Sequence, residues 1–110
     1  MEYEIKACLK DIELAIQEIY QFLPKKRNFL AFQKNLKTRK AVERNIEIIG
    51  EAMDRILKMD PNIQITDSRK IVDTRNRIIH GYDVVSDDVI WLIVNKSLPI
   101  LEQEVKKILG

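Results

Sequence analysis

The stretch AVERNIEIIGEAMDRI, from Ala41 to Ile56, decides the fold class of this chain. Its apolar residues recur every three or four positions, as residues on one face of an α-helix do. They are Val42, Ile46, Ile49, Met53 and Ile56, flanked by a second line through Ala41, Ile48 and Ala52. A face this wide fits either one broad core or a core with a second subunit beside it. The pattern predicts a long helix that begins near Asn35 and ends at Asp60 and Pro61.

The sequence before this helix has the same spacing. Apolar residues between Glu2 and Leu23 predict a first helix, which Pro24 stops because proline lacks the backbone N–H that a helix needs. The connection that follows could hold a short extra turn of helix from Phe29 to Phe32.

The sequence after the long helix predicts two more helices. The first runs from about Ser68 to His80 and closes at Gly81, and the second is capped by Ser86 and bent midway by Pro99. The segment 89–94 is apolar on every side, which predicts that it is buried all round. Four main helices with short links predict an all-α, up-and-down four-helix bundle in a single domain, residues 1–110.

Composition narrows the classes of function. Cys8 is the only cysteine and His80 the only histidine, so a disulfide within the chain and a Cys/His zinc site within one subunit are both excluded. The sequence has no glycine-rich phosphate loop, and we expect no cofactor. Charges are spread through the N-terminal segment and no apolar run is long enough to span a bilayer, which predicts a cytoplasmic protein without membrane contact.

Basic residues crowd one third of a chain whose net charge is only +2. They are Lys25, Lys26, Arg27, Lys34, Lys37, Arg39 and Lys40. Such a cluster could contact phosphates, or it could be a solvated surface of loop and helix.

The segment DTRNRIIHGY, from Asp73 to Tyr82, is the candidate for chemistry. On a helix its apolar residues, Ile78 and Ile79 among them, define an inward face. Arg75 and Asn76 interrupt this face, so either a buried network, with a glutamate such as Glu51, or a ligand groove must satisfy them. His80 follows Asn76 by four residues, which brings the amide within reach of the imidazole and could fix its tautomer.

Metal-free cleavage of RNA needs a base, an acid and a cation that holds the phosphate. Arg75, and also Arg77, can supply the cation. One histidine does not readily serve as acid and base together, so this chemistry predicts a homodimer that brings two His80 side chains to one cleft.

The sequence RNRIIHGY resembles the R-x4-H-x-Y motif of HepT-like toxins of the HEPN superfamily, with Arg75, His80 and Tyr82 at the fixed positions. The Ala41–Ile56 stretch is similar to the central helix of that family, including its I-G-E-A core. One difference lies before the motif helix, where Thr66-Asp67-Ser68 lacks the Pro-Trp pair common in relatives.

The resemblance implies a homodimeric helical bundle with metal-independent endoribonuclease activity and a site to which Arg75 and His80 of both subunits contribute. It also implies a partner, a minimal nucleotidyltransferase antitoxin that neutralises the toxin by transferring AMP to Tyr82. Two other hypotheses remain open at this point. One is a non-catalytic module that binds a nucleotide or docks the nucleotidyltransferase, and the other is a purely structural helical dimer, which leaves Arg75, Asn76 and His80 unexplained.

Overall fold

The computed structural model describes residues 2–80 and 85–110, and this part of the chain is built from helices and short connections, with no strand. Its segments are α1 (Tyr3–Phe22), α2 (Phe29–Lys34), α3 (Leu36–Met59), α4 (Ser68–His80), α5 (Asp87–Leu92), the π-helix η1 (Ile93–Ser97) and α6 (Leu98–Leu109). The predicted all-α class is confirmed, and α2 is the short extra helix. None of the described helices has the length and apolar character needed to cross a membrane.

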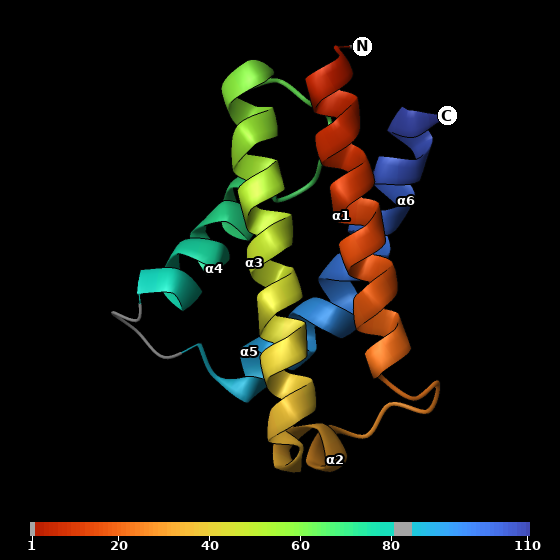
Figure 1. Cartoon of the computed structure of the whole chain (residues 1–110), viewed down its shortest axis with the longest axis vertical. Helices are drawn as coiled ribbons and strands as arrows, with labels where there is room; N and C mark the ends of the chain where they lie inside the picture. Colours follow the sequence, from red (N-terminus) through yellow and green to blue (C-terminus); the bar gives the residue numbers. More distant parts are fainter. Residues whose placement is uncertain (1, 81–84) are drawn as a thin grey trace.

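The long helix α3 is the centre of the arrangement (Figure 1). Helix α1 runs beside it in the opposite direction, α6 packs on α1, and α4 packs obliquely on α3 (Figure 1). The bundle measures 42 × 32 × 19 Å. Since a helix with its side chains is about 10 Å across, the thin dimension accommodates only about two helix layers. Helix α4 therefore has the bundle on one side, and its last turn extends away from α3 (Figure 1).

The core lies where α1, α3 and the helices of the C-terminal segment meet. Its completely enclosed side chains are Leu9, Ile12, Ile16, Ile19, Val42, Ile49, Met53, Ile56, Ile90, Val94 and Val105. Burying a side chain of this size stabilises the fold by about 1.5–3 kcal/mol. The apolar faces predicted for the first, long and last helices supply these residues, which explains why the three pack together.

Side-chain caps fix where the helices begin. The Asn35 side chain accepts a hydrogen bond of 3.0 Å from the backbone N–H of Thr38 at the start of α3. The Ser86 hydroxyl accepts one of 3.4 Å from the N–H of Val89, which confirms the predicted cap of the last helix. Each cap satisfies an N–H that has no partner within its helix. Gly81, predicted to close α4, lies outside the described residues.

The predicted last helix is divided by a π-helical segment. In η1 the hydrogen bonds reach back five residues, as from the N–H of Leu98 to the carbonyl of Ile93. Pro99 follows directly, in the first turn of α6, and it has no N–H to donate to the carbonyl of Asn95. The distortion caused by this proline therefore lies in the turn before it, as a wider helix.

Two apolar side chains that the pattern placed in the interior are exposed. Leu92 is 52% exposed, so the prediction that residues 89–94 are buried all round is wrong. Ile79, predicted on the inward face of α4, is 48% exposed. Periodicity identifies an apolar face, but in one copy of this chain no described element covers the outer side of α5 or the last turn of α4.

Candidate active site

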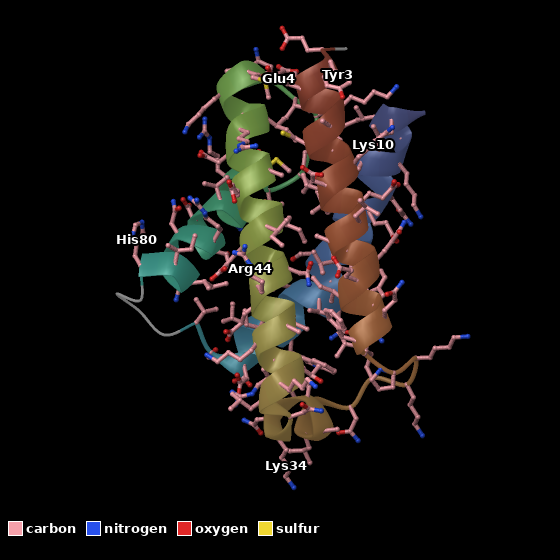
Figure 2. All side chains as sticks on the ribbon, viewed as in Figure 1. Tyr3, Glu4, Lys10, Lys34, Arg44 and His80 are labelled. Carbon is pink, nitrogen blue, oxygen red and sulfur yellow. The ribbon has the colours of Figure 1, made fainter. Side chains whose placement is uncertain are left out.

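The motif residues lie on the second half of α4. Arg75 and Asn76 are half-buried, whereas Arg77 and His80 are exposed. His80 lies at the end of the helix, and its ring extends away from the bundle (Figure 2). Tyr82, the predicted acceptor of AMP, lies outside the described residues.

Arg75 packs against α3 at Gly50. A Cβ atom on Gly50 would lie 2.1 Å from Cβ of Arg75 and 2.7 Å from its Cγ, far inside any allowed contact. The two helices can approach this closely only because Gly50 has no side chain. The aliphatic part of Arg75 therefore lies across the backbone of α3, and this contact fixes the position of the side chain that carries the guanidinium.

The guanidinium is then held by its neighbour on α4. Nη1 of Arg75 donates a hydrogen bond of 2.9 Å to Oδ1 of Asn76. The Nε atom of Arg75 is buried and has no hydrogen-bond partner among the residues that the structure describes. A buried donor of this kind costs about 1–3 kcal/mol unless a ligand or water satisfies it.

The network that we considered with Glu51 is not the observed one. Glu51 is exposed and lies 3.6 Å from Arg55, on its own helix. The Asn76 amide, expected to orient His80, instead offers its oxygen to Arg75. The structure thus brings Arg75 and Asn76 together as predicted, with the amide orienting the cation.

The positions of these side chains around α4 explain how the site is arranged. With about 100° per residue, Arg75 and His80 are about 140° apart around the helix, while Asn76 and His80 are only about 40° apart. The bond to Asn76 directs the Arg75 guanidinium from the face that meets α3 toward the flank that carries His80. A phosphate on this flank could meet a cation from Arg75 and a proton donor or acceptor from His80.

An ion pair holds the beginning of α5, the next described helix after α4. Nη1 of Arg39 donates to both carboxylate oxygens of Asp87, at 3.1 and 3.3 Å, and so ties the beginning of α3 to the beginning of α5. Arg39 belongs to the basic cluster of the sequence, and no sequence pattern predicted its pairing with Asp87. Gly50 was missed as well, although a glycine within a wide apolar helix face is a signal of close helix approach.

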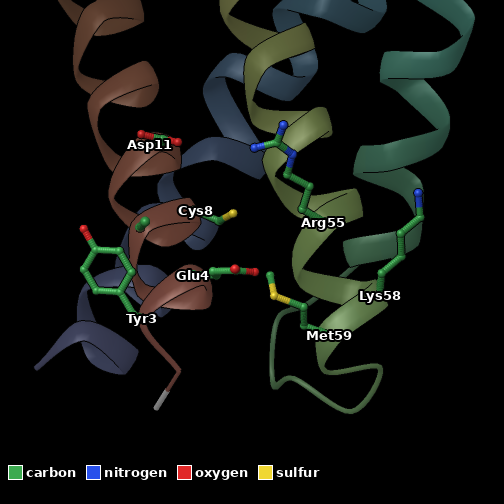
Figure 3. A pocket seen from close by; sticks show the side chains of 8 residues that line it. Tyr3, Glu4, Cys8, Asp11, Arg55, Lys58 and Met59 are labelled. Atoms are coloured by element: carbon green, nitrogen blue, oxygen red, sulfur yellow. The ribbon is translucent and has the colours of Figure 1, made fainter.

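A separate hollow of about 510 Å³ lies between the beginning of α1 and the end of α3 (Figure 3). Charged side chains of both signs line it, together with Cys8 (Figure 3). Burial raises the pKa of the Cys8 thiol, and the nearby Arg55 only partly opposes this. The thiol is therefore neutral near pH 7 and is a poor nucleophile. In the described part of the chain, no three His, Cys, Asp or Glu residues are grouped as a metal site would require.

Comparison with known proteins identifies the family. The family model "Ribonuclease HepT-like" matches residues 12–108. A protein of Thermococcus cleftensis named "Probable ribonuclease HepT" is 33% identical, with 98% of each chain covered. One of Methanocaldococcus jannaschii named "Putative RNase MJ1380" is 32% identical, with 94% of each chain covered. One of Caldanaerobacter subterraneus named "Putative RNase TTE0752" is 31% identical over 96% of this chain and 90% of the relative. No solved structure matches. The resemblance inferred from the motif and the central helix is confirmed, and this chain belongs to the ribonuclease HepT-like family of the HEPN superfamily.

Proposed function

We propose that this chain is a metal-independent endoribonuclease, the toxin of a toxin–antitoxin module, that cleaves RNA in a site shared by two copies of the chain. Membership of the family supports ribonuclease activity in general. The observation that carries the finer proposal is the state of the half-buried Arg75. Its Nη1 is hydrogen-bonded to Asn76, whereas its buried Nε has no hydrogen-bond acceptor among the described residues. A phosphate oxygen fits such a cation, because guanidinium donors match phosphate geometry.

The reaction has a defined balance of bonds and protons. The 2′-oxygen of a ribose attacks the adjacent phosphorus, the bond from phosphorus to the 5′-oxygen breaks, and one product retains a 2′,3′-cyclic phosphate. A base takes the proton of the 2′-hydroxyl, and an acid gives a proton to the leaving 5′-oxygen. Arg75, with Arg77 as a second cation, stabilises the charge that develops on the phosphate oxygens.

A homodimer completes the acid–base pair. Imidazole can serve either role near neutral pH, but each chain has a single histidine, His80. Two His80 side chains at one cleft provide one base and one acid. Pairing through this end of α4 would also cover the exposed Ile79, which is favourable for an apolar side chain.

Control by a partner is the second part of the proposal. A minimal nucleotidyltransferase antitoxin transfers AMP to Tyr82, two residues after His80. The added phosphate carries negative charge and bulk into the neighbourhood of a cationic site, where it competes with the phosphates of RNA. This assignment rests on the family resemblance and on the spacing of the motif.

Single-residue variants test the nuclease proposal. We expect the purified protein to cleave single-stranded RNA in EDTA, and we expect His80→Ala and Arg75→Ala each to reduce kcat at least about 100-fold, in line with the loss of an acid–base group or a charge-stabilising donor. Arg69→Ala is the matched control, since Arg69 is an exposed arginine on the first turn of α4. Cleavage that survives in the His80 variant would remove His80 from the mechanism.

The non-catalytic module is the alternative, and the same Arg75 supports it. A cation with an unsatisfied Nε could bind the phosphate of a nucleotide without any cleavage. Absence of cleavage by the wild type, together with a rise in Tm on adding AMP that Arg75→Ala abolishes, would establish binding in place of catalysis.

A further inference from the structure

One end of the bundle carries positive residues that play no part in the proposed active site. Residues 19–42 contain no aspartate or glutamate and seven lysines and arginines. Because the whole chain has a net charge of +2 and this segment contributes +7, the remaining residues carry a net charge of −5. The chain is therefore strongly polarised, although its overall charge is small.

The fold gathers this segment at one place. The end of α1, the connection after it, α2 and the first turns of α3 together form one end of the molecule (Figure 1). Lys34 lies at the extreme of this end, well away from His80 (Figure 2). The positive charge thus forms a surface of its own, separate from the motif.

Three of the seven cations are already engaged within the fold, among them Lys40, whose Nζ lies 3.8 Å from a carboxylate oxygen of Glu43. Arg27 donates to the backbone oxygen of Pro24 and lies 5.6 Å from the centre of the Tyr20 ring. Arg39 is paired with Asp87.

Four other cations are available to a ligand. Lys25, Lys26, Lys34 and Lys37 are exposed, and none has a carboxylate within 4 Å in the described part of the chain. Lys58 on α3, in contrast, pairs with Asp54 at 3.1 Å. We name these four lysines the basic end.

Apolar side chains are exposed among these lysines. Phe22 is 41% exposed, Leu30 62% and Leu36 56%. Lysines that contact phosphates, interleaved with apolar and aromatic side chains on which bases can rest, are what proteins use to hold single-stranded nucleic acid.

We propose that the basic end is a second contact surface for single-stranded RNA, which binds the backbone of the substrate at a distance from the cleaved bond. This inference deepens the proposed function and rests on RNA being the substrate. RNA is favoured over an acidic protein because a ribonuclease must attract a polyanion, and the rest of this chain, at −5, opposes that attraction. The basic end reduces the electrostatic repulsion between the chain and the RNA, and it orients the strand as the strand approaches.

Salt-dependent binding tests the proposal. Binding of a labelled single-stranded RNA is measured by fluorescence anisotropy over a range of KCl concentrations, in the full chain carrying His80→Ala so that the RNA stays intact. The double variants K34Q/K37Q and K25Q/K26Q each remove two charges from the basic end. The matched control is K6Q/K10Q, which removes two exposed lysines of α1 outside the cationic segment.

Each phosphate contact to a single strand contributes about 0.7 to the slope of log K against log salt. We therefore expect each basic-end pair to lower the slope by about 1.4 and to weaken binding in low salt, with no change in the control. In the chain with native His80, K34Q/K37Q should raise KM and leave kcat unchanged. All six lysines are exposed, so Tm should stay the same, and the two basic-end pairs check each other if one fails to fold.

Equal slopes and affinities in the basic-end and control variants would overturn the proposal. Unchanged RNA affinity combined with lost binding to polyglutamate or to phosphatidylserine vesicles would overturn it too, because the surface would then serve another anion. The result is independent of the nuclease assignment: if the wild type fails to cleave RNA, the slopes measured with His80→Ala still decide whether the basic end binds it.

Discussion

The contact between Gly50 and Arg75 permits a quantitative prediction. In Gly50→Ala the new Cβ would lie 2.1 Å from Cβ of Arg75, whereas carbon atoms in contact are about 3.5–4.0 Å apart. The obstructing atom is attached to the backbone and cannot rotate away. Helix α4 must therefore move away from α3 by more than about 1 Å, and the guanidinium moves with it.

Two opposing terms determine the change in the free energy of unfolding. Overpacking of a helix contact costs about 1–3 kcal/mol, while alanine in place of glycine inside a helix gains about 1 kcal/mol. We expect Gly50→Ala to destabilise the protein by up to about 2 kcal/mol. Displacing a catalytic group by about 1 Å can cost about 100-fold in rate, so activity should fall much more than stability.

A double-mutant cycle by urea unfolding isolates the contact. Arg75→Gly removes both clashing atoms and leaves the backbone oxygen of Ile71, at 3.3 Å, as the nearest neighbour. In that background Gly50→Ala should stabilise the protein by up to about 1 kcal/mol, so the coupling energy should equal the overpacking cost of about 1–3 kcal/mol. Arg75→Ala is the matched control, because it keeps the Cβ at 2.1 Å and so keeps the clash. The same effect of Gly50→Ala in the Arg75→Gly and Arg75→Ala backgrounds would refute the reasoning.

Three further predictions concern the dimer, the ion pair and the buried thiol. Mixing wild type with increasing His80→Ala chains should reduce ribonuclease activity as the square of the wild-type fraction, and a linear fall would show that one His80 suffices. Asp87→Ala should destabilise the protein by about 1 kcal/mol in urea unfolding, and a double-mutant cycle with Arg39→Ala should assign this to the partly buried pair rather than to the helix terminus. Because burial raises the pKa of Cys8, its alkylation should be slow near neutral pH and accelerate on unfolding. Rapid alkylation of the folded chain at pH 7 would contradict this prediction. Since the folded state favours the neutral thiol, the free energy of unfolding should also decrease as pH rises through the ordinary pKa of the thiol.

Local patterns were enough to predict most of the fold. The three-four spacing in Ala41–Ile56 located α3, and cap residues such as Ser86 located helix starts, because both depend on neighbours along the chain. The exposure of Leu92 and Ile79 could not be predicted this way. An apolar face in a sequence does not reveal whether this chain or a second copy covers it.

The sequence pointed to Arg75 and Asn76 as candidates, but it did not predict which residues of the fold support them. Arg75 and Asn76 stood out because polar residues interrupted an apolar face, and they do lie together. The partner of Arg75 could not be predicted, because Glu51 and Gly50 are adjacent in sequence and only the packing of α4 on α3 decides which one it meets. Long-range contacts of this kind depend on crossing geometry, which no single helix pattern contains.

The two proposed catalytic groups are constrained very differently, and this difference bears on the proposed dimer. The aliphatic part of Arg75 is fixed by packing at Gly50, and its guanidinium is fixed by the hydrogen bond to Asn76. Arg75 can therefore bind a phosphate with little reorganisation. His80 lies exposed in the last turn, beyond the contact of α4 with α3, where the described residues of one chain leave the ring open to water. A proton-transfer group works best in a site from which bulk water is excluded. A second copy that covers Ile79 and the end of α4 would supply that enclosure together with the second imidazole, so pairing would assemble the acid–base half of the site around a phosphate-binding half that each chain has already formed.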